Sequence, residues 1–195
     1  MTAEQVPPPW VRIVGGHTLI GGGASVQLGA VCRVEVDIAI NAVPGEAAER
    51  WVLANRRCFS EAQVKQLTAD FTSGCCAQGI LGALGFVLGG GDYNRHQQAQ
   101  DVVLQAASRA QADFVEALRT LSNQPMRLTS DIEVYGTSLV PSVAGVFARI
   151  VQLRFADGAS SNFADLSEPV AADSSGNVAA VRAGRGHRLR MVPDH

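Results

Sequence analysis

The sequence contains few charged residues, and their charges nearly cancel. Of its 195 residues 17% are Asp, Glu, Lys or Arg, and the formal net charge is −2. Such a chain has no general attraction to nucleic acid or anionic lipid, so a partner of either kind would need a local patch. Lysine is nearly absent, because Lys65 is the only one. This usage is typical of a GC-rich bacterial genome.

Cysteine is also sparse, and its spacing does not fit a metal site. The four cysteines are Cys32, Cys58 and the adjacent pair Cys75 and Cys76. No CxxC spacing is present, and no histidine lies at a zinc-ligand separation from them. Adjacent cysteines seldom bond to each other because the short ring strains the peptide. We therefore expect free, buried thiols and no bound metal.

Motifs that carry common enzyme chemistry are missing. A phosphate loop needs GxxxxGK followed by Ser or Thr, whereas the GxxxxG spacing at 16–21 is followed by Gly22 and Gly23. GxGxxG, HExxH and GxSxG are absent too. The four histidines stand outside any such motif, at His17, His96, His187 and His195. We expect no cofactor and no catalytic residue, although an enzyme without a sequence motif remains a third possibility.

The first twelve residues, MTAEQVPPPWVR, do not look like a secretory signal. They carry an acidic residue and three consecutive prolines, where a signal would need a basic start and an apolar run. This predicts a cytoplasmic protein.

Alternating residues predict strands near both ends of the chain. In VCRVEVDIAIN the apolar residues Val34, Val36, Ile38 and Ile40 would point to one face, with charged and polar residues on the other. The same period returns in MRLTSDIEVYG and GVFARIVQLRFADG. We predict strands within 11–43 and 126–156, with a turn at Asp157-Gly158.

Helices are predicted between these strands. Pro44-Gly45 ends the first strand region, and residues 45–57 read as a short helix. Ser60 followed by Gln63 has the spacing of a capping box, and Val64, Leu67 and Phe71 then recur at helical spacing.

The stretch GILGALGFVLGGG, residues 79–91, has two readings. The apolar run over about 74–91 is diluted by glycine and falls short of the ~20 apolar residues that span a bilayer. Conditional insertion into a membrane stays open. The favoured reading is a helix over 75–88 whose stripe of Gly79, Gly82 and Gly85 lets a neighbouring backbone come close.

The partner of that stripe is expected in the next segment. From about residue 92 or 94 to residue 122, small and apolar residues recur in steps of four and three, the spacing of a helix seam. The seam residues are Val103, Ala107, Ala110 and Phe114, followed by Ala117 and Leu121. We predict one long helix that forms a hairpin with the glycine-rich one.

The predicted fold class is α+β, with one antiparallel sheet from N- and C-terminal strands and a central Gly/Ala-rich helical hairpin. Residues 1–10 form a proline-rich segment and 11–158 a single domain, with strands at 11–43, helices at 45–122 and strands at 126–156. Residues 159–195 form an irregular acidic segment, with at most a weak strand, and a basic tail. No linker or internal repeat is evident.

The expected function is that of a non-enzymatic structural subunit of a bacterial homo-oligomer. Its contacts would be the helix-packing residues Gly79, Gly82, Gly85, Val103, Ala107, Ala110 and Phe114. The basic tail, with Arg182, Arg185, Arg188 and Arg190, could add a charged contact to the acidic segment of the next subunit. The alternative is a membrane-active protein that uses residues 74–91. Nucleic acid is not an expected partner, and a small-molecule ligand is left open.

Overall fold

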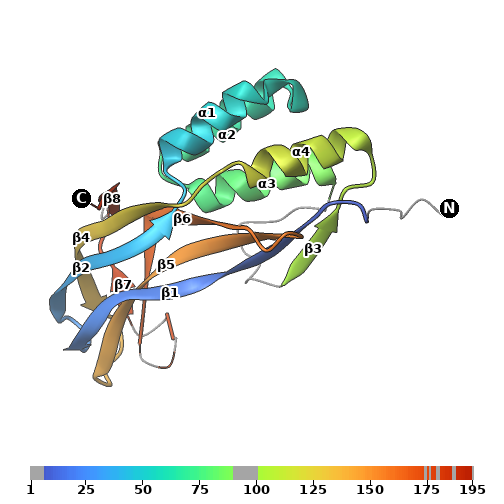
Figure 1. Ribbon diagram of the computed structural model, residues 1–195. Coiled ribbons are helices and arrows are strands. Elements are labelled where there is room, and N and C mark those ends of the chain that lie inside the picture. Colours follow the sequence, from blue (N-terminus) through green and yellow to red (C-terminus); the bar gives the residue numbers. More distant parts are fainter. Residues whose placement is uncertain are drawn as a thin grey trace.

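The computed structural model describes residues 7–89, 101–173, 175, 177–178, 181–185 and 188–194. Strands dominate, and the helices are inserted among them (Figure 1). In chain order the elements are β1 (Trp10–Val26), β2 (Val31–Ala42), α1 (Gly45–Ala54), the 3-10 turn η1 (Arg56–Cys58), α2 (Glu61–Thr72), α3 (Cys76–Leu88), β3 (Val102–Gln105), α4 (Arg109–Arg119), β4 (Gln124–Gly136), β5 (Ser142–Phe155), β6 (Ser160–Asp173), β7 (Val181–Ala183) and β8 (Arg190–Pro193).

The strands form two antiparallel sheets. Sheet A has the order β3-β1-β5-β6, and sheet B has β2 beside β4, with β7 and β8 both pairing with β4. β2 and β4 stay in one register over twelve residue pairs, from Val31 with Tyr135 to Ala42 with Gln124. The alternation predicted for this strand is confirmed, since Val34 and Val36 are buried while Arg33, Glu35 and Asp37 are exposed.

Each face of sheet A is covered over only half its length. On β5, Val151, Leu153 and Phe155 point to the face that the helices cover. Towards the other end of the strand the buried residues are at the even-numbered positions Ala144, Val146 and Ala148, which pack against sheet B. Because side chains alternate along a strand, the two layers lie on opposite faces of sheet A. β1 and β5 therefore contribute to two hydrophobic cores.

The core beneath the helices is built around aromatic rings. Trp51 of α1 lies 5.7 Å from Phe114 of α4 and 6.3 Å from Phe59, between ring centroids. The Trp51 indole N–H donates to the carbonyl of Ala117 at 3.0 Å, which ties α1 to α4. Phe163 and Leu153 of sheet A are fully buried in the same cluster.

The predicted fold class is wrong in two respects. The strands form two sheets rather than one, and the described residues contain no central helical hairpin. Of the helix predicted from residue 92 or 94 to 122, residues 92–100 lie outside the described ranges, Val102–Gln105 is the strand β3, and α4 begins only at Arg109. The predicted helix seam therefore combined residues of two different elements. Val103 lies on β3, where it pairs with Arg12 of β1, and the seam residues from Ala110 onward lie on the separate helix α4. Ser108 caps that helix by accepting from the Gln111 N–H.

Residues 160–173, expected to be irregular or weakly extended, form the fourteen-residue strand β6. Other local predictions are confirmed. Ser60 and Gln63 form a complete capping box at the start of α2, and a helix spans Cys76–Leu88. The four cysteines are free, as predicted, but only Cys76 is buried, and Cys32, Cys58 and Cys75 are half-buried.

Candidate functional site

One end of the molecule exposes apolar side chains on an uncovered part of sheet A. β5 continues from the helix-covered residues through Arg149 to Phe147, Gly145 and Val143 on the same face. Leu19 of β1 and Val170 of β6 flank Phe147 in the pairing register. We call this the open half-face and define it by Leu19, Val143, Phe147 and Val170.

Further exposed apolar side chains lie towards the same end of the molecule as the open half-face. Leu19 is 57% exposed and Val143 47%. Among the described residues, six of the eleven exposed large hydrophobic side chains belong to this end of the molecule: Leu19, Leu28, Val31, Leu139, Val140 and Val143. Contiguous apolar surface on a folded protein commonly marks a contact with another molecule.

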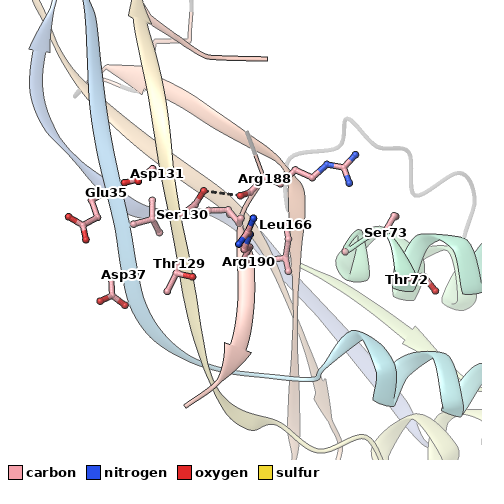
Figure 2. Close-up of a pocket in the computed structure, with 13 residues that line it drawn as sticks. Glu35, Asp37, Thr72, Ser73, Thr129, Ser130, Asp131, Leu166, Arg188 and Arg190 are labelled. Atoms are coloured by element: carbon pink, nitrogen blue, oxygen red, sulfur yellow. Dashed lines mark hydrogen bonds between the residues drawn. The ribbon is translucent and has the colours of Figure 1, made fainter. Parts of the chain in front are cut away.

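A polar groove lies elsewhere, beside sheet B, and has a volume of about 850 Å³. It is lined by the centres of β2 and β4, the end of α2, Leu166 of β6 and the segment that leads into β8. Figure 2 shows Glu35, Asp37 and Asp131 pointing away from Leu166, while the Ser130 hydroxyl points to the Arg188 backbone. The groove residues thus include carboxylates on β2 and β4 and two arginines, Arg188 and Arg190, on the segment that leads into β8.

The charges at this groove are largely organised by the sheet itself. Glu35 lies directly opposite Asp131, and Asp37 opposite Thr129. The Arg127 guanidinium forms a two-bonded pair with Asp37, with the second bond at 3.0 Å, and its hydrogen bond holds the pKa of Asp37 below its usual value. Two acidic side chains directly opposite each other disfavour the strand pair. The groove can accommodate a polar ligand of mixed charge.

Ser130 in the groove and Cys76 in the core are not activated as nucleophiles. The Ser130 hydroxyl donates to the Arg188 carbonyl at 2.8 Å, so its hydrogen is held by a backbone oxygen rather than by a base. Burial raises the pKa of Cys76 to about 12, which keeps its thiol protonated at neutral pH. Within the described ranges no group of three His, Cys, Asp or Glu is placed to hold a metal ion.

The predicted helix-packing residues are not brought together. A Cβ at Gly79 would lie 3.0 Å from the Phe71 ring, and one at Gly82 would lie 3.5 Å from Leu67, so both glycines face α2 of the same chain. Gly85 is half-buried near the end of α3, and Phe114 is buried in the helix core. Val103 is exposed on β3, while Ala107 and Ala110 are exposed around the start of α4. The neighbour expected for α3 was the next helix along the chain, whereas the structure places α2 there.

The basic residues of the tail lie over sheet B. Arg182 on β7 lies 5.7 Å from the centre of the Tyr135 ring, and Arg190 on β8 pairs with Thr129 of β4. Arg185 and Arg188 are exposed in the connection between β7 and β8. Arg182 and Arg190 therefore belong to strands of sheet B, and Arg185 and Arg188 to the connection between these strands.

Two acidic residues near that tail, Asp157 and Asp173, have partners within the same chain. Asp157 pairs with Arg119 of α4 at 2.7 Å, and Asp173 accepts hydrogen bonds from Ser175 and the Asn177 N–H.

Asp165 has a structural role that the sequence does not reveal. It lies on β6 beside the first turn of α3, whose N-cap residue Cys75 makes no side-chain cap. The Asp165 carboxylate accepts the Gln78 N–H at 3.2 Å, and so occupies a position that favours negative charge. Burial nevertheless raises the pKa of Asp165, against the opposing effects of the Gln78 N–H, Arg149 and the Ala77 N–H, while Asp70 raises it further.

This raised pKa gives a predicted pH dependence. The pKa of Asp165 is higher in the folded protein than its ordinary value of 3.8, so the folded state binds this proton more tightly than the unfolded state. The contribution of Asp165 to the free energy of unfolding therefore falls as the pH rises from about 3.8 through the folded pKa. Asp165→Asn keeps an oxygen acceptor and removes the ionisation. We expect this variant to gain stability relative to the wild type between pH 4 and pH 7.

Asp165→Ala is the matched variant, because it removes the cap as well as the charge. Loss of a helix cap costs about 1 kcal/mol, so it should be less stable than Asp165→Asn at both pH values. Urea unfolding at pH 4 and pH 7 measures both effects. If Asp165→Asn is the less stable protein at pH 7, attraction to Arg149 and the helix terminus outweighs the cost of burial.

One feature of the sequence marks the apolar end, and it is independent of the alternation pattern. It is the absence of charged residues from two segments. Residues 18–32 and 134–148 carry no Asp, Glu, Lys, Arg or His, and the structure places these two segments side by side. That sheet A is left open there could not be read from the sequence, because it depends on where the helices end.

Among the described residues, no helix has both the length and the apolar character needed to cross a bilayer. No family model matches the chain, and neither the curated proteins nor the solved structures include a significant match to it.

Proposed function

We propose that this protein is a non-enzymatic, self-associating structural subunit, and that its copies meet through the open half-face of sheet A. The single observation that carries the proposal is this half-covered apolar face. On one face of β5 the side chains of residues 151–155 are buried by the helices. Phe147 and Val143 follow on the same face, and no described element covers them.

A second copy is the occupant that fits this surface. At the half-face sheet A consists of β1, β5 and β6, and the row of Leu19, Phe147 and Val170 runs across these three strands. Two sheet faces can pack by interdigitating such rows, as the layers of a sandwich do. A two-fold axis would let the same patch serve both copies.

The arrangement of charge supports the same conclusion. His17 and Arg149 pair with each other at the boundary between the open half-face and the helix-covered residues. Beyond them, towards the end of the molecule, the two segments without charge begin. An interface with an apolar centre and a polar edge is the usual form of a specific protein contact.

The proposed contact differs from the route through the glycine stripe, because Gly79 and Gly82 already pack against α2. The alternative of membrane insertion by residues 74–91 would require α3 to leave the core, where seven of its residues are buried. A cytoplasmic location and a bacterial source remain predictions from composition.

The test is the solution mass of Leu19→Glu, measured by size-exclusion chromatography with light scattering over a range of concentrations. We expect the wild type to run as two or more subunits, and Leu19→Glu to run as a monomer with an unchanged melting temperature. Placing a carboxylate in an apolar contact costs several-fold or more in affinity.

Leu53→Glu is the matched control, because Leu53 is 49% exposed on α1, away from the open half-face. This variant should keep the mass of the wild type. A wild-type monomer at every concentration, or a Leu19→Glu protein that still assembles, would disprove the proposal.

A further inference from the structure

Two turns lie together at the end of the molecule, away from the helices (Figure 1). Residues 27–30 join β1 to β2, and residues 137–141 join β4 to β5. The Leu28 N–H donates to the Ser138 carbonyl at 2.6 Å, and the Gly136 N–H donates to the Ala30 carbonyl at 3.0 Å. We call these two turns the tip.

The tip presents three aliphatic side chains to solvent. Leu139 is 80% exposed, Val140 69% and Leu28 56%. In a folded protein, side chains of this kind are seldom grouped at such exposure without a function. They lie on turns at the end of the strands, whereas the open half-face lies on the flat of sheet A.

The tip itself carries no charge. Charged side chains begin close behind it, with Arg33 on β2, Glu133 on β4, and Arg182 of β7 beside Tyr135. Shallow insertion of the tip residues alone would therefore remove no ionised group from water, and the burial of such a group is the largest cost of a transfer into an apolar medium.

Part of the tip backbone is hydrogen-bonded within the protein. Besides the two bonds between the turns, the Ala30 N–H donates to the Gln27 carbonyl at 2.8 Å. The Val140 N–H donates to the Ser138 hydroxyl at 3.2 Å. Irregular backbone enters lipid only when its polar groups are paired within the protein, and these donors are paired.

We propose that the tip binds a lipid bilayer by inserting Leu28, Leu139 and Val140 into the boundary between headgroups and acyl chains, without spanning it. A protein partner would need a matching pocket, and the tip offers no charged group to orient one. A bilayer needs neither, and shallow insertion of aliphatic side chains is sufficient for reversible binding. The contact is separate from the open half-face, so it does not rest on the proposed function.

The test is cosedimentation with vesicles of neutral phosphatidylcholine, and with vesicles that also contain anionic phosphatidylserine. We expect the wild type to bind both to a similar extent, and high salt to leave the bound fraction unchanged, because no charge takes part. Leu139→Ser combined with Val140→Ser should lower the partition coefficient about tenfold or more.

The matched control makes the same exchanges at exposed residues elsewhere, Leu53→Ser on α1 and Val192→Ser on β8. This double variant should bind vesicles as the wild type does. Leu19→Glu should also keep its vesicle binding even where it abolishes assembly, which separates failure of this inference from failure of the proposed function.

Three results would overturn the inference. The first is that neither kind of vesicle binds the wild type. The second is binding to anionic vesicles alone that is lost in high salt, which would assign the contact to charged residues elsewhere. The third is that the Leu139→Ser and Val140→Ser variant loses assembly without losing vesicle binding, which would assign the tip to a contact between copies.

Discussion

Gly136→Ala is expected to destabilise the protein by about 3 kcal/mol, at the upper end of the usual cost of overpacking. A Cβ at this position would overlap the backbone of Gln27, both its nitrogen and its carbonyl group. Flexible side chains can move aside, but this neighbour is main chain held by the hydrogen bonds between the two turns. Urea unfolding of the purified variant measures the loss.

Gly16→Ala is the control for this substitution. Gly16 lies on β1, and a Cβ there would meet nothing within 4 Å. Glycine inside a strand costs about 0.5–1 kcal/mol relative to alanine, so this variant should equal or exceed the stability of the wild type. If the two variants unfold at the same urea concentration, the turns are not packed as described.

Trp51→Ala should cost about 3–5 kcal/mol, the range for removing a large aromatic side chain from a core. The indole contacts Phe59 and Phe114, and its N–H bond to Ala117 joins two helices. A loss of this size is a large part of the 5–15 kcal/mol that stabilises a typical domain. Thermal and urea unfolding should both show it.

Two further variants separate the contributions of Trp51. Trp51→Phe keeps a ring but loses the hydrogen bond, and should cost more than the roughly 1 kcal/mol of that bond because the smaller ring also leaves space. Leu53→Ala, two residues away and half-exposed, should change the free energy of unfolding by well under 1 kcal/mol. A Trp51→Ala protein as stable as Leu53→Ala would show that α1 and α4 do not share a core.

The elements that could be predicted from sequence are those whose signal is local. The alternation around Val34 and Val36 identified β2, and Ser60 with Gln63 identified the start of α2, because each pattern depends on neighbouring residues only. These signals are independent of where the rest of the chain lies.

The errors arose where a local pattern was weak and tertiary contacts decided. Alanine is common in helix seams but carries little directional information, so Val103 and Ala107 were joined to a helix that begins at Arg109. β6 contains Pro169 and several Ser, Asp and Ala residues, and it is extended because β5 pairs with it on either side of a register shift. Strand propensity depends strongly on such context.

The candidate site was missed for a different reason. Apolar residues at strand positions are usually buried, so nothing in the sequence singles out Leu19 or Phe147. The exposure of Leu19 and the partial exposure of Phe147 follow from the length of β1 and β5 relative to the helices, and no short stretch of sequence encodes that difference.

The sharing of β1 and β5 between two cores also sets the order in which those cores can be completed. On a ribosome α1, α2 and α3 are made before residue 90, yet much of the sheet surface that covers them comes from Val151, Leu153 and Phe163. Their apolar faces must therefore wait while more than half of the remaining chain is synthesised. Long waits of this kind expose nascent helices to aggregation and to chaperones, and they make the last strands of sheet A the step that closes the core beneath the helices.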